Sequence, residues 1–294
     1  MSGNRIQLGN ASVTRVVETK IEMRTSLFGQ TPAQAWSSHA DLLAPDFVDL
    51  DRGQWRIAMQ TWVIEVDGLT VLVDTGVGNG RDRPHMPPLD HLDTDYLAGL
   101  GRAGVDPDAV DVVINTHLHT DHVGWNTLLS GDAWVPTFPN ARYLMPEADY
   151  RFFHPDDGPG VNDGMRLVFC DSVFPVEEQM VLWSGQYELS PSLTVRAAPG
   201  HTPGSSVVWL DAGEPAVFVG DLTHCPIQIV RPDDPCAFDV DSLAASQSRS
   251  AVFADVARLG AYLVPAHYPG HGGARLRTDG DAFAVDGWLG LEAI

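Results

Sequence analysis

The chain has 294 residues, of which 44% are hydrophobic and 19% charged, a composition that suffices for a sizeable buried core. Acidic residues outnumber basic ones by 39 to 18, and the net charge of −21 argues against nucleic acids and anionic membranes as partners. No stretch approaches the ~20 apolar residues of a membrane span, and no secretory signal is recognisable. The three cysteines form no CxxC pair, so we expect a cytoplasmic protein without structural disulfides.

Strands and helices are expected to alternate along the chain without internal repeats. Asp67-Gly68, set between two β-branched runs, predicts a hairpin. The longest helical stretch has its expected core positions at Leu243, Val252, Phe253, Val256 and Leu259. In chain order, the predicted elements are strands at 61–66 and 70–73, a helix at 93–103, strands at 110–114 and 141–145, a helix at 147–153, strands at 193–197, 205–210 and 216–219, a helix at 241–259 and a strand at 261–264.

The Pro- and Gly-rich stretch 76–88 is predicted to be an exposed loop. Its Gly-Val-Gly-Asn-Gly start has the wrong spacing for either standard phosphate-binding fingerprint. Apolar side chains elsewhere are candidates for the wall of a substrate pocket: Phe28, Trp36, Trp62, Trp125, Phe153 and Trp183.

Residues 117–122, His-Leu-His-Thr-Asp-His, follow the strand expected at 110–114 and supply three imidazoles and a carboxylate. His117 and His119 are two residues apart, so an extended backbone points both side chains to one face. Asp121 and His122 follow where the chain must turn, and they can face a second centre. Imidazole and carboxylate suit zinc and similar divalent ions, and two such ions side by side activate water. The motif therefore predicts a metal-dependent enzyme.

Three later segments each place one more potential ligand at the end of an expected strand. His201 lies in a Pro-Gly-His-Thr-Pro-Gly turn, Asp221 follows the strand at 216–219, and His267 follows the strand at 261–264. Strand ends and the loops after them are where active sites are commonly built. These segments strengthen the prediction of a metal site.

With these motifs in this order, the chain resembles the metallo-β-lactamase superfamily from about residue 60 to about residue 273. Residues 71–76, Val-Leu-Val-Asp-Thr-Gly, resemble the strand and turn that precede the first metal loop in that family. The resemblance implies an α/β protein with a four-layer αβ/βα sandwich, and we expect a single domain over 1–294. Residues 1 to about 59 would be an N-terminal extension that covers the active site or forms a dimer contact, so a homodimer stays open.

The resemblance also implies two divalent ions, with zinc expected first and manganese, cobalt or iron as alternatives. The implied ligands are His117, His119 and His201 for the first ion and Asp121, His122 and His267 for the second, with Asp221 bridging the two. Aspartate at position 221, where some zinc β-lactamases carry cysteine, resembles the dinuclear hydrolase branch. Asp74 is expected to hold the metal loop by hydrogen bonds rather than to bind an ion.

For the reaction, the resemblance implies that a hydroxide shared by both ions attacks the carbonyl of a small neutral or apolar lactone or ester, with phosphotriester cleavage as a side activity. Asp121 and Asp221 are expected to orient the nucleophile, and Asp121 to carry a proton to the leaving oxygen. The stretch 220–224, Gly-Asp-Leu-Thr-His, resembles the methyl-parathion-hydrolase-like and quorum-quenching lactonase branch. His224 is expected either to donate to the substrate or to support the ligands from behind.

Other activities on the same scaffold stay open. An iron-dependent oxidoreductase of the persulfide dioxygenase type keeps the same loop motif, so metal identity distinguishes it better than sequence does. A thioesterase of the glyoxalase II type needs cationic side chains for the carboxylates of glutathione, and we locate no such cluster. RNA-processing nucleases are disfavoured by the acidic charge. A non-catalytic binding protein is disfavoured because all seven expected ligands are present.

Overall fold

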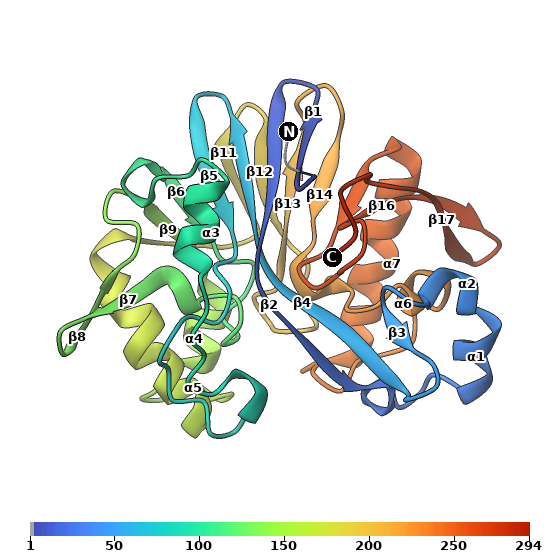
Figure 1. The fold of residues 1–294 in the computed structure, drawn as a ribbon, viewed down its shortest axis with the longest axis horizontal. Coiled ribbons are helices and arrows are strands. Elements are labelled where there is room, and N and C mark those ends of the chain that lie inside the picture. Colours follow the sequence, from blue (N-terminus) through green and yellow to red (C-terminus); the bar gives the residue numbers. More distant parts are fainter. Residues whose placement is uncertain (1–2) are drawn as a thin grey trace.

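Two mixed β-sheets form the centre of the protein in the computed structural model, which describes residues 3–294 (Figure 1). In the first sheet the order is β1-β2-β4-β5-β6-β9-β10, and β3 pairs with β4. Its strands are β1 (Arg5–Leu8), β2 (Ala11–Arg24), β3 (Val48–Asp49), β4 (Gln54–Val66), β5 (Leu69–Val73), β6 (Val112–Ile114), β9 (Arg142–Pro146) and β10 (Met180–Trp183).

The second sheet has its strands in chain order, from β11 to β17. They are β11 (Gln186–Ser190), β12 (Leu193–Ala197), β13 (Ser206–Leu210), β14 (Ala216–Phe218), β15 (Tyr262–Val264), β16 (Ala274–Asp279) and β17 (Ala282–Trp288). A separate hairpin joins β7 (Thr127–Ser130) to β8 (Ala133–Pro136).

Helices lie outside the sheets on both sides (Figure 1). The first sheet is flanked by α3 (Tyr96–Arg102), α4 (Glu147–Phe153) and α5 (Asp163–Val168), and the second by α6 (Ile227–Val230) and α7 (Ser242–Leu259). Two short helices, α1 (Ala33–Ser38) and α2 (Ala40–Leu43), precede β3. Short 3₁₀ or π-helical segments cover Thr25–Leu27, Pro87–Leu89, Pro107–Ala109, Gly124–Asn126, Phe169–Val173, Phe174–Gln179 and Gly220–Leu222.

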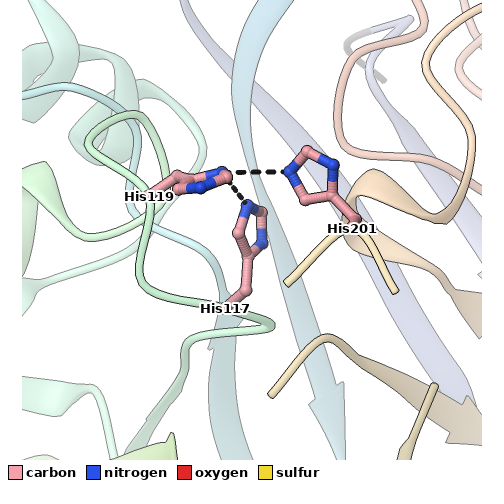
Figure 2. Close-up of side chains that lie close together, drawn as sticks. All are labelled: His117, His119 and His201. Carbon is pink, nitrogen blue, oxygen red and sulfur yellow. Dashed lines mark hydrogen bonds between the residues drawn. The ribbon is translucent and has the colours of Figure 1, made fainter. Parts of the chain in front are cut away.

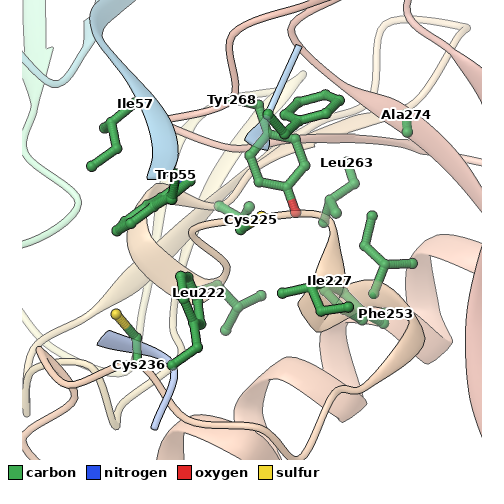
Figure 3. Close-up of a cluster of buried hydrophobic side chains, with 14 of the residues drawn as sticks. Trp55, Ile57, Leu222, Cys225, Ile227, Cys236, Phe253, Leu263, Tyr268 and Ala274 are labelled. Atoms are coloured by element: carbon green, nitrogen blue, oxygen red, sulfur yellow. The ribbon is translucent and has the colours of Figure 1, made fainter. Parts of the chain in front are cut away.

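The hydrophobic core divides into an inner layer and two outer layers. In β4, Trp62 and Ile64 belong to the cluster between the sheets, whereas Val63 belongs to the cluster under α3 to α5, because successive side chains of a strand point to opposite faces. A third cluster joins the second sheet to α7 and to the start of β4, where Trp55 and Phe253 belong to one apolar group (Figure 3). These layers give the four-layer αβ/βα sandwich that the sequence predicted.

Several local predictions are confirmed. β4 and β5 form the expected hairpin, and Asp67 and Gly68 at its turn have the positive φ angles of 53° and 77° that such a two-residue turn requires. The longest helix, α7, begins after Asp241, whose carboxylate accepts the backbone N–H of Ala244, and ends at Gly260 with a φ of 62°.

Two predicted core positions of α7 are wrong. Leu243 is 69% exposed and Leu259 is 47% exposed. The buried face of the helix instead runs through Arg249, Phe253 and Val256. The apolar residues alone do not identify the buried face of α7, because the charged Arg249 lies in the middle of that face.

The segment after β5 is more buried than its Pro- and Gly-rich sequence predicts. The backbone N–H groups of Val77 and Gly78 donate to the Glu18 carboxylate at 2.6 and 3.0 Å, so a side chain of the protein itself satisfies both donors. Arg81 and Arg83 are only 1% and 0% exposed. The exposed loop predicted here is therefore wrong for these residues, because their buried partners come from distant parts of the chain.

Residues of the expected N-terminal extension supply β1, β2 and the start of β4. β2 and β4 pair as far as Arg24 and Gln54, and this end of the ribbon runs towards α1 and β3 (Figure 1). The single domain over 1–294 stays a prediction, and residues 1 and 2 lie outside the described residues. Within residues 3–294, no helix is both long enough and apolar enough to cross a membrane.

Candidate metal centre

All seven expected metal ligands lie in loops that follow strands of the two sheets. β6 leads into residues 117–122, and β12 leads into the turn with His201. β14 and β15 lead to Asp221 and His267. β6 belongs to the first sheet and β12, β14 and β15 to the second, and four segments that are far apart in sequence meet where the two sheets pack together.

Three imidazoles form the first group (Figure 2). The His119 Nδ1 atom lies 3.1 Å from Nε2 of His117 and 3.0 Å from Nε2 of His201. His117 and His201 are only 1% and 2% exposed. Three ring nitrogens converging in a buried site form a donor set suited to a divalent ion.

The second group consists of Asp121, His122 and His267. The Asp121 Oδ2 atom lies 3.7 Å from Nε2 of His122 and 3.4 Å from Nε2 of His267. These atoms again supply imidazole nitrogen and carboxylate oxygen, the donors that zinc and similar ions accept.

The carboxylate of Asp221 lies between the two groups. Its Oδ2 atom faces the first group, at 3.3 Å from His201 Nε2 and 3.8 Å from His117 Nε2. Its Oδ1 atom faces the second group, at 3.0 Å from His267 Nε2 and 3.3 Å from His122 Nε2. One oxygen for each group is the arrangement that a bridging ligand needs.

The polar atoms of this site fit bound cations. His122 Nε2 and Asp221 Oδ1 are fully buried and have no hydrogen-bond partner among the described residues. Buried polar atoms are rarely left unpaired, because losing water without a replacement costs free energy. Cations between the two groups would give both atoms a partner.

The electrostatics of the first ligand group and of Asp221 favour cation binding. Desolvation lowers the pKa of His119 to about 3 and that of His117 well below its usual range, so both rings stay neutral and can offer a lone pair. Burial raises the pKa of Asp221, but the neighbouring His267 and His122 outweigh it and hold the pKa well below the usual range. The carboxylate is therefore ionised when it faces the two groups.

Asp74 holds the metal loop by hydrogen bonds, as the sequence predicted. Its Oδ1 accepts the Thr116 backbone N–H at 2.7 Å, and its Oδ2 accepts the Thr116 hydroxyl at 2.8 Å. The same Oδ2 lies 2.9 Å from Nδ1 of His122. This contact leaves Nε2 of His122 facing the candidate site, the outer contact that metal-binding histidines usually make.

Asp149 in α4 is a supporting residue that the sequence did not reveal. Its Oδ2 accepts the Leu118 N–H at 3.0 Å and the Thr202 hydroxyl at 2.8 Å, and its Oδ1 accepts the Gly204 N–H at 2.6 Å. One buried carboxylate thus connects the loop of His117 and His119 to the turn of His201. Burial raises the pKa of Asp149 to about 6.

Replacing this carboxylate is expected to loosen both loops at once. Asp149→Ala should weaken metal binding by about 10–100-fold, because the loops that carry five of the expected ligands lose their common anchor. Competition with a chromophoric chelator measures the change. The matched control is Glu147→Ala in the same helix. Among residues 3–294 the Glu147 carboxylate forms an ion pair only with exposed Arg151, so this variant should bind metal as the wild type does. Equal affinities for all three proteins would contradict the anchoring role.

His224 also lies at this site. Its Nε2 atom is 3.2 Å from Asp221 Oδ2, and its ring centroid is 4.9 Å from that of His201. Trp55 approaches it edge-on at 6.0 Å. Neither ring nitrogen has a hydrogen-bond partner among the described residues, and burial lowers the pKa of His224, so the ring is neutral.

An apolar cavity opens directly beside the candidate ligands. Among the expected pocket aromatics, Phe153 lines it, whereas the others pack into the hydrophobic clusters. A sequence can predict that an aromatic side chain is buried, but not whether it lies in the core or lines a pocket. Strands β2 and β4 form part of the wall of this cavity. Its apolar lining consists of Ile21, Met23, Trp55, Ile57, Met59, Met86, Leu89, Phe153, Met165 and Phe238.

Comparisons with known proteins agree with this architecture. The chain is 27% identical over 148 residues to the N-acyl homoserine lactonase AttM of Azorhizobium caulinodans, covering 47% of this chain and 50% of that protein. It is 24% identical over 166 residues to the N-acyl homoserine lactonase AiiA of Bacillus thuringiensis subsp. kurstaki, covering 51% and 57%. The chain thus spans about half the length of these curated relatives.

Solved structures share the fold over nearly the whole chain. The hydrolase AbOPH of the beta-lactamase superfamily superposes with a TM-score of 0.79 at 23% identity, covering 98% of this chain and 97% of that one. AidC, a dizinc quorum-quenching lactonase, superposes with a TM-score of 0.76 at 18% identity, covering 97% and 96%. The family model of the metallo-beta-lactamase superfamily matches residues 60–267, a span that contains all seven candidate ligands. The chain therefore belongs to the metallo-β-lactamase superfamily.

Proposed function

We propose that the protein is a dinuclear metal-dependent hydrolase that opens lactones or cleaves simple esters. The observation that carries the proposal is the Asp221 carboxylate, which presents one oxygen to each of two ligand groups beside an apolar cavity. The lactonases among the relatives support the choice of substrate class. Zinc is the proposed metal, because the donors are imidazole and carboxylate.

In this proposal, His117, His119 and His201 hold one ion, and Asp121, His122 and His267 hold the other, with Asp221 shared. When bound, the ions supply Lewis acidity, which brings the pKa of a water towards neutrality and polarises a carbonyl oxygen. Asp221 and Asp121 orient the attacking water. As the water adds to the carbonyl carbon, Asp121 takes a proton from it; the ester C–O bond then breaks, and Asp121 passes that proton to the leaving oxygen. Asp121 lines the cavity, where it can meet that oxygen.

The cavity favours a neutral, apolar substrate. Its wall contains four methionines, whose flexible side chains adapt to acyl or aryl groups of different shape. The overall charge of −21 also disfavours anionic substrates. Phosphotriester cleavage as a side activity, a homodimer, and a cytoplasmic protein without nucleic-acid or membrane partners stay predictions.

The test is proton release followed by pH-stat with zinc-reconstituted protein. The substrates are an acyl lactone, an aryl ester, an aryl phosphotriester and a β-lactam. We expect fast opening of the lactone or ester, loss of activity after chelation, and recovery on adding zinc. Protein that holds two metal ions but releases no protons with any of the four substrates would refute the hydrolase.

His224 is proposed to donate a hydrogen bond to the substrate carbonyl, because its neutral ring lines the cavity and has no hydrogen-bond partner among the described residues. His224→Ala should lower kcat/KM by about 100-fold, a loss typical of removing one such donor. Metal content, measured by atomic absorption, should stay at the wild-type value. A fall in metal content instead would mean that His224 holds the neighbouring metal ligands in place rather than contacting the substrate.

A further inference from the structure

Arg249 is a fully buried cation in the middle of α7, and it contacts the segment that follows Asp221. Its side chain is 0% exposed. The Nε atom donates to the Leu222 carbonyl at 2.7 Å. Nη1 donates to the carbonyls of Pro232 and Asp234 at 2.7 and 3.1 Å. Arg249 therefore connects α7 to both ends of the stretch from 222 to 234, and one contact is made to the residue next to Asp221.

The same guanidinium faces a carboxylate that contacts the first ligand group. Arg249 Nη2 lies 3.7 Å from Oδ2 of Asp239, and both side chains are fully buried. Asp239 Oδ1 in turn lies 3.1 Å from Nδ1 of His201. A buried carboxylate needs a nearby opposite charge, because desolvation otherwise disfavours the ionised form. Arg249 is thus paired with Asp239, and Asp239 holds the His201 ring with Nε2 towards His119.

We propose that Arg249 is a positioning residue for the first metal site, acting through Asp239 on His201 and through the Leu222 carbonyl on Asp221. No other side chain among residues 3–294 forms an ion pair with Asp239 except His201 itself. The inference rests on the proposed metal ligands but not on the proposed substrate. It can therefore be tested by metal binding even if no lactone or ester is cleaved.

The experiment compares zinc affinities, by chelator competition well below the unfolding temperature, for Arg249→Met, Asp239→Asn and the double variant. Arg249→Met should weaken binding of one of the two ions by about 10–100-fold, as expected for loss of an outer contact. Both residues act on His201, so their effects should overlap. The double variant should therefore lose much less zinc affinity than the two single-variant fold-losses multiplied together. Arg258→Met is the matched control, since Arg258 belongs to the same helix but pairs with Asp255 at the surface.

A purely structural role predicts a different pattern. Arg249→Met would then unfold at a lower temperature, while the folded protein would bind both ions as the wild type does. That result, or losses that multiply fully in the double variant, would overturn the proposal. If Arg249→Met does not fold, the same cycle is run with Arg249→Gln, which removes the charge beside Asp239 but keeps an amide that can donate to a backbone carbonyl. Fully multiplying losses in that cycle would count equally against the proposal.

Discussion

Asp221→Ala is expected to lower turnover of the best lactone or ester by on the order of 10³-fold, because the variant loses the one carboxylate that faces both ligand groups. Without Asp221, each ligand group would lose a negatively charged oxygen donor and would hold its ion less tightly. We therefore expect the metal content to fall from two ions to one or fewer per chain. Steady-state kinetics and atomic absorption on the same preparations measure both effects.

The matched control is Asp211→Ala, which removes an exposed carboxylate from the end of β13. It should keep wild-type turnover and metal content. An Asp221→Ala protein that retains two ions and near wild-type turnover would remove Asp221 from the centre. Loss of turnover with both ions retained would instead limit its role to orienting the water.

Asp171→Ala is expected to lower the free energy of unfolding by about 3–5 kcal/mol, because it leaves buried arginines without their carboxylate partner. Asp171 lies 2.8 Å from both terminal nitrogens of Arg83 and 2.9 Å from Nη1 of Arg81. Both arginine side chains are 0% exposed, so water cannot replace the lost charge. Urea denaturation with a two-state analysis measures the change.

Glu65→Ala provides the contrast, because it breaks a surface ion pair with Arg5 whose side chains are 46% and 45% exposed. Such a pair contributes only about 0–1 kcal/mol, so Glu65→Ala should change stability little. Arg83 also donates to the Thr120 hydroxyl, next to Asp121, so Asp171→Ala should in addition weaken metal binding. Equal stabilities for the Asp171 and Glu65 variants would mean that hydrogen bonds to backbone carbonyls are enough to stabilise the buried charges of Arg81 and Arg83.

Much of the candidate site was predictable from sequence because its signals are local. Residues 117–122 carry four of the ligands within one loop, and the other three follow short apolar runs that form strands. The hairpin at Asp67-Gly68 and the start of α7 at Asp241 were predictable for the same reason, since turn and cap chemistry depend on neighbouring residues. The family motifs and the strand and helix alternation together determined the layered fold.

The supporting residues were decided only by the tertiary structure. Asp149, Asp171, Asp239 and Arg249 are charged, and charged side chains are normally at the surface, so a single sequence predicts them to be exposed. Each is buried because its partners come from distant segments, as Asp149 shows by binding Leu118 and Gly204. The pocket wall has the same origin. Its apolar side chains resemble any others of the core, and only the packing of the β2–β4 ribbon beside the candidate metal ligands makes them a wall.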